Sequence, residues 1–218
     1  MNPRPAHSEL SGFNDLAGRS IEAIVIGASA GGVDALSEIL PALRRGAAVA
    51  TMVVLHIPRE RPSLLASIFA DRCAQPVVEA QDKEPAQAGV IYFAPPDYHL
   101  LVDRSEEGPL LAMSNEELVN FSRPAIDVLF ESAADVYGPH LLGIVLTGGN
   151  HDGAAGLQAI ARAGGVTVVQ SPQQAQVPYM PAQALALGNI DYVLTLPQIA
   201  DLLRTLGVTG NDQEKERR

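Results

Sequence analysis

Three polar side chains that could act together in nucleophilic catalysis stand at or just beyond the ends of apolar runs in this sequence: Ser29, His56 and Asp152. A serine hydroxyl can attack a carbonyl carbon when an imidazole takes its proton and a carboxylate orients that imidazole. The apolar runs have the length and continuous apolar character of strands buried on both faces: IEAIVIG (21–27), VATMVVLHI (49–57) and LLGIVLT (141–147). Because parallel strands end at one edge of a sheet, the three side chains could meet there.

The pentapeptide GASAG at 27–31 fits G-x-S-x-G, the pattern of a serine on a tight turn between a strand and a helix. Its small residues allow a sharp turn, and unpaired N–H groups at a helix start can stabilise a developing oxyanion. We expect such donors near Ala30 and in the Gly148–Gly149 loop. Serine is also a common helix cap, so this pattern by itself leaves a structural role for Ser29 open.

The imidazole and the carboxylate also have competing interpretations. His56 is favoured as the base because it lies at a strand end, as Ser29 does, but His151 remains a rival. Since His151 adjoins Asp152, and adjacent loop residues rarely face each other with hydrogen-bonding geometry, we prefer His56. His99 lies within a strand pattern and could support the site from behind. Asp152 precedes a glycine at a helix start, where a carboxylate is expected as an N-cap regardless of function.

The rest of the sequence supplies elements that could position these residues. Helical periodicity is expected at 31–46, from about Pro62, from about Pro124, at 152–165, near 181–187 and at 197–206. Further strands are predicted in VTVVQ, DYVLTL and a middle region that contains PVVEA, VIYFAP, YHLLVD and PLLAM. This alternation predicts an α/β fold: a doubly wound, mostly parallel sheet with helices on both faces and a short antiparallel β excursion.

Length and polarity define the expected domain organisation. The 218 residues fit one domain, at 20–209, between a flexible N-terminal tail (1–19) and a charged C-terminal tail (210–218).

Charge and composition narrow the classes of partner and cofactor. The chain has 15 Lys and Arg against 25 Asp and Glu, and a net charge of −10 disfavours nucleic acid and anionic lipid as partners. No apolar run has signal-peptide or membrane-span length, so we expect a cytoplasmic protein without direct membrane insertion. The single cysteine, Cys73, excludes an internal disulfide, and no Cys/His spacing resembles a zinc site. We expect neither a metal nor an organic cofactor.

The chain resembles the catalytic domain of the chemotaxis protein-glutamate methylesterases in five motifs that follow one order: IVIGASAGGVDAL, LHIP, YFAPPDYHL, RPAIDVLF and LTGGNHDGAAG. The resemblance extends over about residues 21–205. It implies that Ser29 is the nucleophile, His56 the base and Asp152 the carboxylate that orients the base. The implied substrate is a glutamyl methyl ester in the cytoplasmic domain of a methylated chemoreceptor, hydrolysed to glutamate and methanol. Deamidation of some receptor glutamines is implied as well.

The sequence departs from that family at three points. Gly149 stands where the loop motif G-M-G-x-D-G has Met, and Ala30 stands where Thr is frequent. The family's N-terminal receiver domain has no counterpart in residues 1–20. We therefore expect intact hydrolytic chemistry that is not controlled by phosphorylation of this chain, with a separate receiver protein as an additional candidate partner.

Two other functions fit parts of the sequence. A dinucleotide-binding domain would also have a glycine-rich turn after its first strand. However, G-x-G-x-x-G requires glycine at Ser29, and His56 occupies the region where the ribose-binding carboxylate is expected. A non-catalytic signalling module with the same fold is favoured only by Gly149 and Ala30.

Overall fold

A parallel β-sheet forms the centre of the computed structural model, which describes residues 19–57 and 63–206. Within these residues the sheet has seven strands in the order β3-β4-β2-β1-β7-β8-β9, and all neighbouring pairs are parallel. The strands are β1 (Ala23–Ala28), β2 (Ala50–Leu55), β3 (Val77–Glu79), β4 (Ile91–Phe93), β7 (Leu141–Val145), β8 (Val166–Gln170) and β9 (Tyr192–Leu194). The predicted doubly wound parallel sheet is confirmed. The two expected tails lie outside the described residues, except for Arg19.

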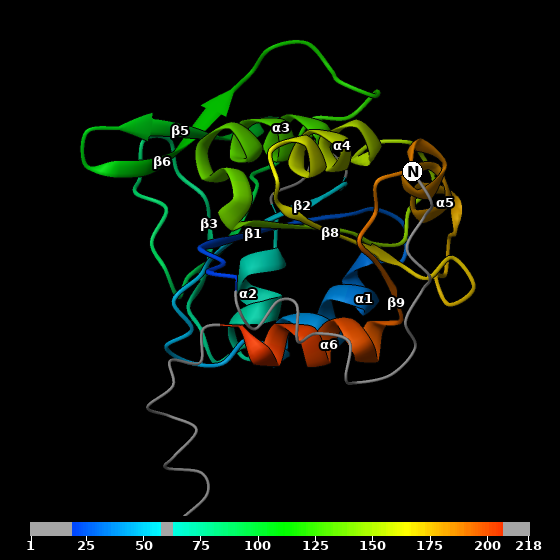
Figure 1. The fold of residues 1–218 in the computed structure, drawn as a ribbon. Helices are drawn as coiled ribbons and strands as arrows, with labels where there is room; N and C mark the ends of the chain where they lie inside the picture. Colours follow the sequence, from blue (N-terminus) through cyan, green and yellow to red (C-terminus); the bar gives the residue numbers. More distant parts are fainter. Residues whose placement is uncertain (1–18, 58–62, 207–218) are drawn as a thin grey trace, which may run out of the picture.

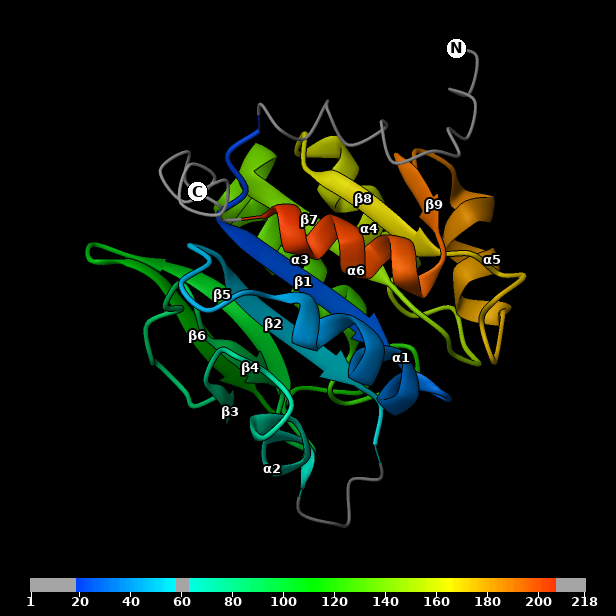
Figure 2. The same cartoon turned by 90° about the horizontal axis from the view of Figure 1, so that it is seen from below.

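Helices cover both faces of this sheet (Figure 1). One face carries α1 (Gly32–Ile39), α2 (Leu65–Ala70) and α6 (Leu196–Thr205), and the other carries α3 (Ile126–Tyr137), α4 (Ala154–Arg162) and α5 (Tyr179–Leu187). Figure 2, seen from the first side, shows α1 and α6 next to each other in front of the sheet. Side chains of β1 alternate between two apolar cores: Ile24 and Ile26 pack under α1 and α6, whereas Val25 packs under α3 and α4.

Two short 3₁₀ helices, η2 (Leu40–Ala42) and η3 (Gly138–His140), each contain a proline. The helix expected at 31–46 therefore ends as an α-helix at Ile39 and continues only as η2, because Pro41 cannot continue the α-helical hydrogen bonds. Within the two described stretches, no helix is both long enough and apolar enough to cross a bilayer.

An antiparallel hairpin, β5 (His99–Ser105) and β6 (Gly108–Ser114), forms the predicted β excursion. It lies beside α3 (Figure 1), where the Val102 N–H donates to the Ser132 hydroxyl at 3.1 Å. The segment that follows β6 runs back to the start of α3 and so approaches the carboxyl edge of the main sheet.

The order of the strands places a switch in chain direction at β1. The chain moves from β1 to β2 on one side, and later returns to β7 on the other side of β1. Open α/β sheets bind ligands outside the carboxyl ends of strands at such a switch point. Ser29, His56 and Asp152 follow β1, β2 and β7, the three strands that meet there.

Candidate functional site

The carboxyl ends of β1, β2 and β7 lie level with one another because their hydrogen-bond ladders continue past the strands. The Ser29 N–H donates to the Thr147 carbonyl at 2.9 Å, and the His56 N–H donates to the Ala28 carbonyl at 3.1 Å. The backbone thus fixes Ser29 and His56 on adjacent strand ends, and Asp152 lies beyond Thr147 in the loop that enters α4.

Ser29 lies on a tight turn that leads directly into α1. The Gly32 N–H donates to the Ser29 carbonyl at 2.8 Å, and the N-cap of α1 is Gly31, in the left-handed conformation with φ 79°. No side chain caps this helix, so Ser29 does not have the capping role that its position allowed. The β7 loop approaches very closely, since a Cβ added at Gly148 would stand 2.9 Å from the Ser29 Cβ. The absence of a side chain at Gly148 therefore leaves the space that the Ser29 side chain needs in this position.

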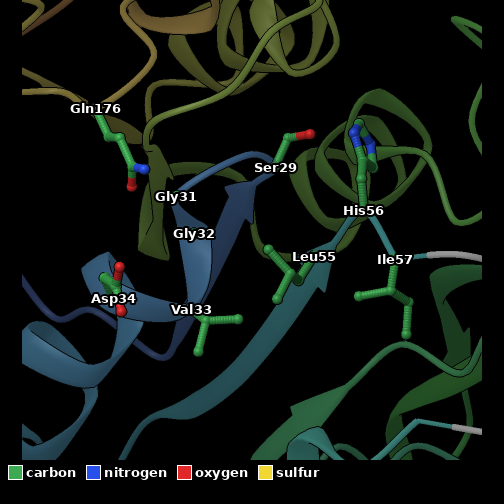
Figure 3. Close-up of a pocket in the computed structure, with 9 residues that line it drawn as sticks. All are labelled: Ser29, Gly31, Gly32, Val33, Asp34, Leu55, His56, Ile57 and Gln176. Carbon is green, nitrogen blue, oxygen red and sulfur yellow. The ribbon is translucent and has the colours of Figure 1, made fainter.

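His56 and Asp152 are joined by a hydrogen bond of 2.9 Å between Nε2 and Oδ2. The His56 side chain is 13% exposed and that of Asp152 is fully buried. Since a carboxylate only accepts, the Nε2 atom carries the proton and Nδ1 is the basic nitrogen. In Figure 3 the Ser29 hydroxyl is directed toward the side of the cavity on which the His56 ring stands. Within the described chain, no hydrogen bond joins the Ser29 hydroxyl to another group.

Several donors stabilise the ionised form of the Asp152 carboxylate. Burial by itself raises the pKa of Asp152, but hydrogen bonds from His56, the Ile126 N–H, Asn120 and the Asp127 N–H outweigh it, and the pKa is lowered. The two backbone donors lie at 2.7 and 3.0 Å. An ionised carboxylate in this position orients the imidazole and would stabilise an imidazolium that forms opposite it.

Asp152 and Asp127 cap each other's helices. Asp152 precedes α4, yet it accepts from the first N–H groups of α3, those of Ile126 and Asp127. Asp127 is in the first turn of α3, yet its Oδ1 accepts from the Gly153 and Gly156 N–H groups at the start of α4, at 2.9 and 2.7 Å. Burial, with the nearby Asp152 charge, raises the pKa of Asp127 to about 6. The N-cap interpretation of Asp152 is therefore partly correct: its Oδ1 accepts from the Gly153 N–H before α4 at 3.1 Å, but most of its backbone donors belong to α3.

Two residues near the site, Asn120 and Asp127, are absent from the sequence-based candidates. Asn120 Nδ2 donates to Asp127 Oδ2 at 2.7 Å and to Asp152 Oδ1 at 2.9 Å. Asp127 lies in the RPAIDVLF motif, so the sequence alone indicates a carboxylate near the start of a helix. Its link to Asp152 was not visible, because these residues are 25 positions apart.

The backbone donors expected for an oxyanion are placed unequally. The Gly148 N–H donates to the Val177 carbonyl at 3.0 Å, so it is not available to a ligand. The N–H groups of Ala30 and Gly149 make no hydrogen bond with any described residue. Ala30 and Gly149 are therefore the candidates for stabilising negative charge that develops beside Ser29.

A cavity of about 270 Å³ opens at Ser29 and His56 (Figure 3). Its walls come from the start of α1, the end of β2 and the segment before α5. They combine apolar Val33, Leu55 and Ile57 with polar Asp34 and Gln176. This volume lies just below the range of about 300–1,000 Å³ for pockets that hold whole small molecules. It suits a single side chain presented by a larger molecule.

The other histidines named from the sequence do not contact Ser29. His99 accepts the Ala125 N–H on Nδ1 at 3.1 Å and donates from Nε2 to the Glu117 carbonyl at 3.0 Å. It thus fixes the entry to α3 and supports the site only through the backbone. His151 is exposed, and its side chain makes no hydrogen bond to the described part of the chain. Among the described residues, no group of three or more His, Cys, Asp or Glu could hold a metal ion.

The fold and site define an α/β protein with serine, histidine and aspartate side chains converging at the switch point of a parallel sheet. Its family follows from sequence comparison: the chain belongs to the CheB methylesterase family, whose profile matches residues 24–203. The crystal structure of the Thermotoga maritima CheB methylesterase catalytic domain is similar, with a TM-score of 0.82 and 30% identity. It covers 85% of this chain and 98% of that one.

Curated relatives carry the corresponding enzyme names. A Leptospira interrogans protein, provisionally named protein-glutamate methylesterase/protein-glutamine glutaminase, is 43% identical over 88% of this chain and 98% of its own length. Protein-glutamate methylesterase/protein-glutamine glutaminase 2 of Rhodospirillum rubrum is 36% identical over 89% of this chain. This chain spans 54% of the Rhodospirillum protein. These relatives support the methylesterase family predicted from the five motifs.

Proposed function

We propose that this chain is a protein-glutamate methylesterase that uses Ser29, His56 and Asp152 to hydrolyse glutamyl methyl esters of chemoreceptors. The observation that carries the site assignment is the bond of a buried, ionised Asp152 to the proton-bearing Nε2 of His56, beside an unbonded serine hydroxyl. A cavity of single-side-chain size at Ser29 agrees with an ester that projects from a protein surface.

The first half of the reaction forms an acyl-enzyme. Ser29 Oγ attacks the ester carbonyl carbon while His56 Nδ1 takes the hydroxyl proton. The carbonyl oxygen becomes an oxyanion, which the Ala30 and Gly149 N–H groups are placed to stabilise. When the intermediate collapses, the imidazolium gives its proton to the departing methoxide, and methanol leaves. Asp152 balances the imidazolium charge throughout.

The second half repeats these steps with water. His56 Nδ1 takes a proton from water, whose oxygen attacks the acyl carbon, and the imidazolium then returns a proton to Ser29 Oγ. The product is an ionised glutamate side chain. The same acyl-enzyme would form from a glutamine with ammonia as the leaving group, so glutamine deamidation is a second reaction of the same site.

The decisive experiment is methanol release from a methylated chemoreceptor cytoplasmic domain. We expect turnover by the wild-type chain and a loss on the order of 10³ or more for Ser29→Ala, with an unchanged circular dichroism spectrum. A Ser29→Ala variant that keeps a near wild-type rate would exclude the assigned nucleophile.

A fluorophosphonate probe separates this proposal from a non-catalytic module of the same fold. An activated serine accepts the phosphonyl group, and a structural serine does not. We expect labelling of wild-type protein that Ser29→Ala abolishes. Absence of labelling, together with absence of methanol release, would favour the non-catalytic module.

A further inference from the structure

The segment between β6 and α3 places an asparagine, Asn120, next to the Asp152 carboxylate. Asn120 is partly buried and has a left-handed backbone conformation with φ 51°. Backbone hydrogen bonds in both directions between Val119 and Ser122 close the turn around it, at 3.2 and 2.9 Å. Arg123 fixes the same segment through Asp97 Oδ1 at 2.7 Å. The position of the Asn120 side chain is therefore set by a well-bonded loop.

Asn120 uses one nitrogen to join two buried carboxylates. Its Nδ2 atom has two hydrogens, and both are used: one for Asp127 Oδ2 and one for Asp152 Oδ1. Asp127 is 6% exposed and Asp152 is 1% exposed. Two like charges in such surroundings repel strongly, because little water screens them. The amide hydrogens lie between these charges.

The same contact determines which Asp152 oxygen faces His56. Oδ1 accepts from Asn120 and from the Asp127 and Gly153 N–H groups, whereas Oδ2 accepts from His56 and the Ile126 N–H. With Oδ1 held from behind, rotation of the carboxylate away from the imidazole would break several hydrogen bonds at once. A carboxylate fixed in this way fixes the plane and tautomer of the imidazole.

We propose that Asn120 is a positioning residue of the esterase site: by bridging Asp127 and Asp152 it holds the two carboxylates in place and directs Asp152 Oδ2 at His56 Nε2. This inference rests on the proposed function of Ser29, His56 and Asp152. It adds a residue that touches neither the substrate nor the imidazole.

Loss of the Asn120 bridge should raise the pKa of the carboxylates to which Asn120 donates. Without Asn120, Asp127 loses one of its donors, while the Asp152 charge, Glu131 on α3 and the Gly153 and Gly156 N–H groups at the start of α4 remain around it. Removing a donor from a carboxylate raises its pKa. Both carboxylates would then take up a proton at higher pH, and protonation of Asp152 would weaken its pull on the imidazole.

The test compares two isosteric substitutions in one segment. Asn120→Asp keeps the side-chain shape but replaces the two N–H donors by a carboxyl group, which donates no hydrogen when ionised and one when protonated. Asn115→Asp makes the same charge change at an exposed position whose side chain has no hydrogen bond within the described residues. The readouts are the rate of Ser29 phosphonylation by a fluorophosphonate, kcat and KM for p-nitrophenyl acetate, and the proton NMR signal of the His56 Nε2–H.

We expect Asn120→Asp to lower kcat and the phosphonylation rate roughly 10- to 100-fold, as for other outer residues that orient a histidine, with KM nearly unchanged. The acid limb of its pH–rate profile should move to higher pH, and the downfield Nε2–H signal should weaken. Asn115→Asp should match the wild type in all three readouts. If Asn120→Asp does not fold, Asn120→Ala with Asn115→Ala as control makes the same comparison, with the same expected directions.

Three results would overturn the inference. The first is a folded Asn120 variant with wild-type phosphonylation. The second is an equal loss in the Asn115 control. The third is a lower melting temperature with neither a shifted acid limb nor a weakened Nε2–H signal, which would indicate a purely structural role. A wild-type chain that fails to react with the fluorophosphonate would instead overturn the proposed function, and this inference with it.

Discussion

Replacement of Asp127 by asparagine should make the stability of this protein less sensitive to pH. Burial raises the pKa of Asp127 from 3.8 to about 6. An acid whose pKa is higher in the folded than in the unfolded state stabilises the folded state when protonated. That contribution is complete below the unfolded-state pKa and is lost as the pH rises through the folded-state pKa. The window for Asp127 therefore runs from about pH 4 to about pH 6.

The size of the effect follows from the same shift. A difference of about two pKa units corresponds to about 3 kcal/mol over the whole window. About 2 kcal/mol of it falls between pH ~4.5 and pH ~7, where Asp152 stays ionised in wild type and variant. In Asp127→Asn the new amide oxygen would still accept from the Gly153 and Gly156 N–H groups, so the cap of α4 is kept. The new amide hydrogens would face those of Asn120. This contact should lower the free energy of unfolding of the variant by an amount that does not depend on pH.

Equilibrium urea unfolding at the two pH values measures this difference. Circular dichroism is the suitable signal, because the chain contains no tryptophan. The difference in unfolding free energy between Asp127→Asn and wild type should move by about 2 kcal/mol in favour of the variant as the pH rises. The other titrating groups occur in both proteins and cancel. A difference that stays constant within about 0.5 kcal/mol would refute the argument that Asp127 carries a buried charge near neutral pH.

The remaining predictions concern the base and the loop after β7. His56→Ala should be nearly as damaging to ester hydrolysis as loss of the nucleophile. His151→Ala should stay within about twofold of wild type, because the His151 side chain is exposed and makes no hydrogen bond within the described chain. Collapse of activity at His151 alone, measured in the same assay, would reverse the choice of base. Gly148→Ala should destabilise the fold by about 1–3 kcal/mol and impair turnover, since its methyl group would overlap the Met180 sulfur. Gly149→Ala is the matched control for stability: the nearest atom to its added Cβ is 3.9 Å away, so the urea midpoint should stay close to wild type.

The sequence alone determined the elements and the three candidate side chains, because those signals are local. Continuous apolar runs define strands buried on both faces, and β1, β2 and β7 occur where such runs were found. Ser29, His56 and Asp152 could be placed at one edge because parallel strands end together. The capping alternative for Ser29 could not be excluded locally, since the choice of Gly31 as N-cap depends on the backbone conformation of the turn.

Tertiary structure decided which groups surround these side chains. Asp152 caps α3 and Asp127 caps α4. Asn120 donates to both carboxylates, although it is 32 positions from Asp152 and 7 positions from Asp127 in the sequence. The Gly148 N–H was a plausible oxyanion donor until the segment before α5 placed the Val177 carbonyl against it. A buried polar group must find a partner wherever the packed chain supplies one, and that partner has no fixed spacing in the sequence. Periodicity therefore determined which residues meet at the sheet edge, and packing decided their hydrogen bonds and charge states.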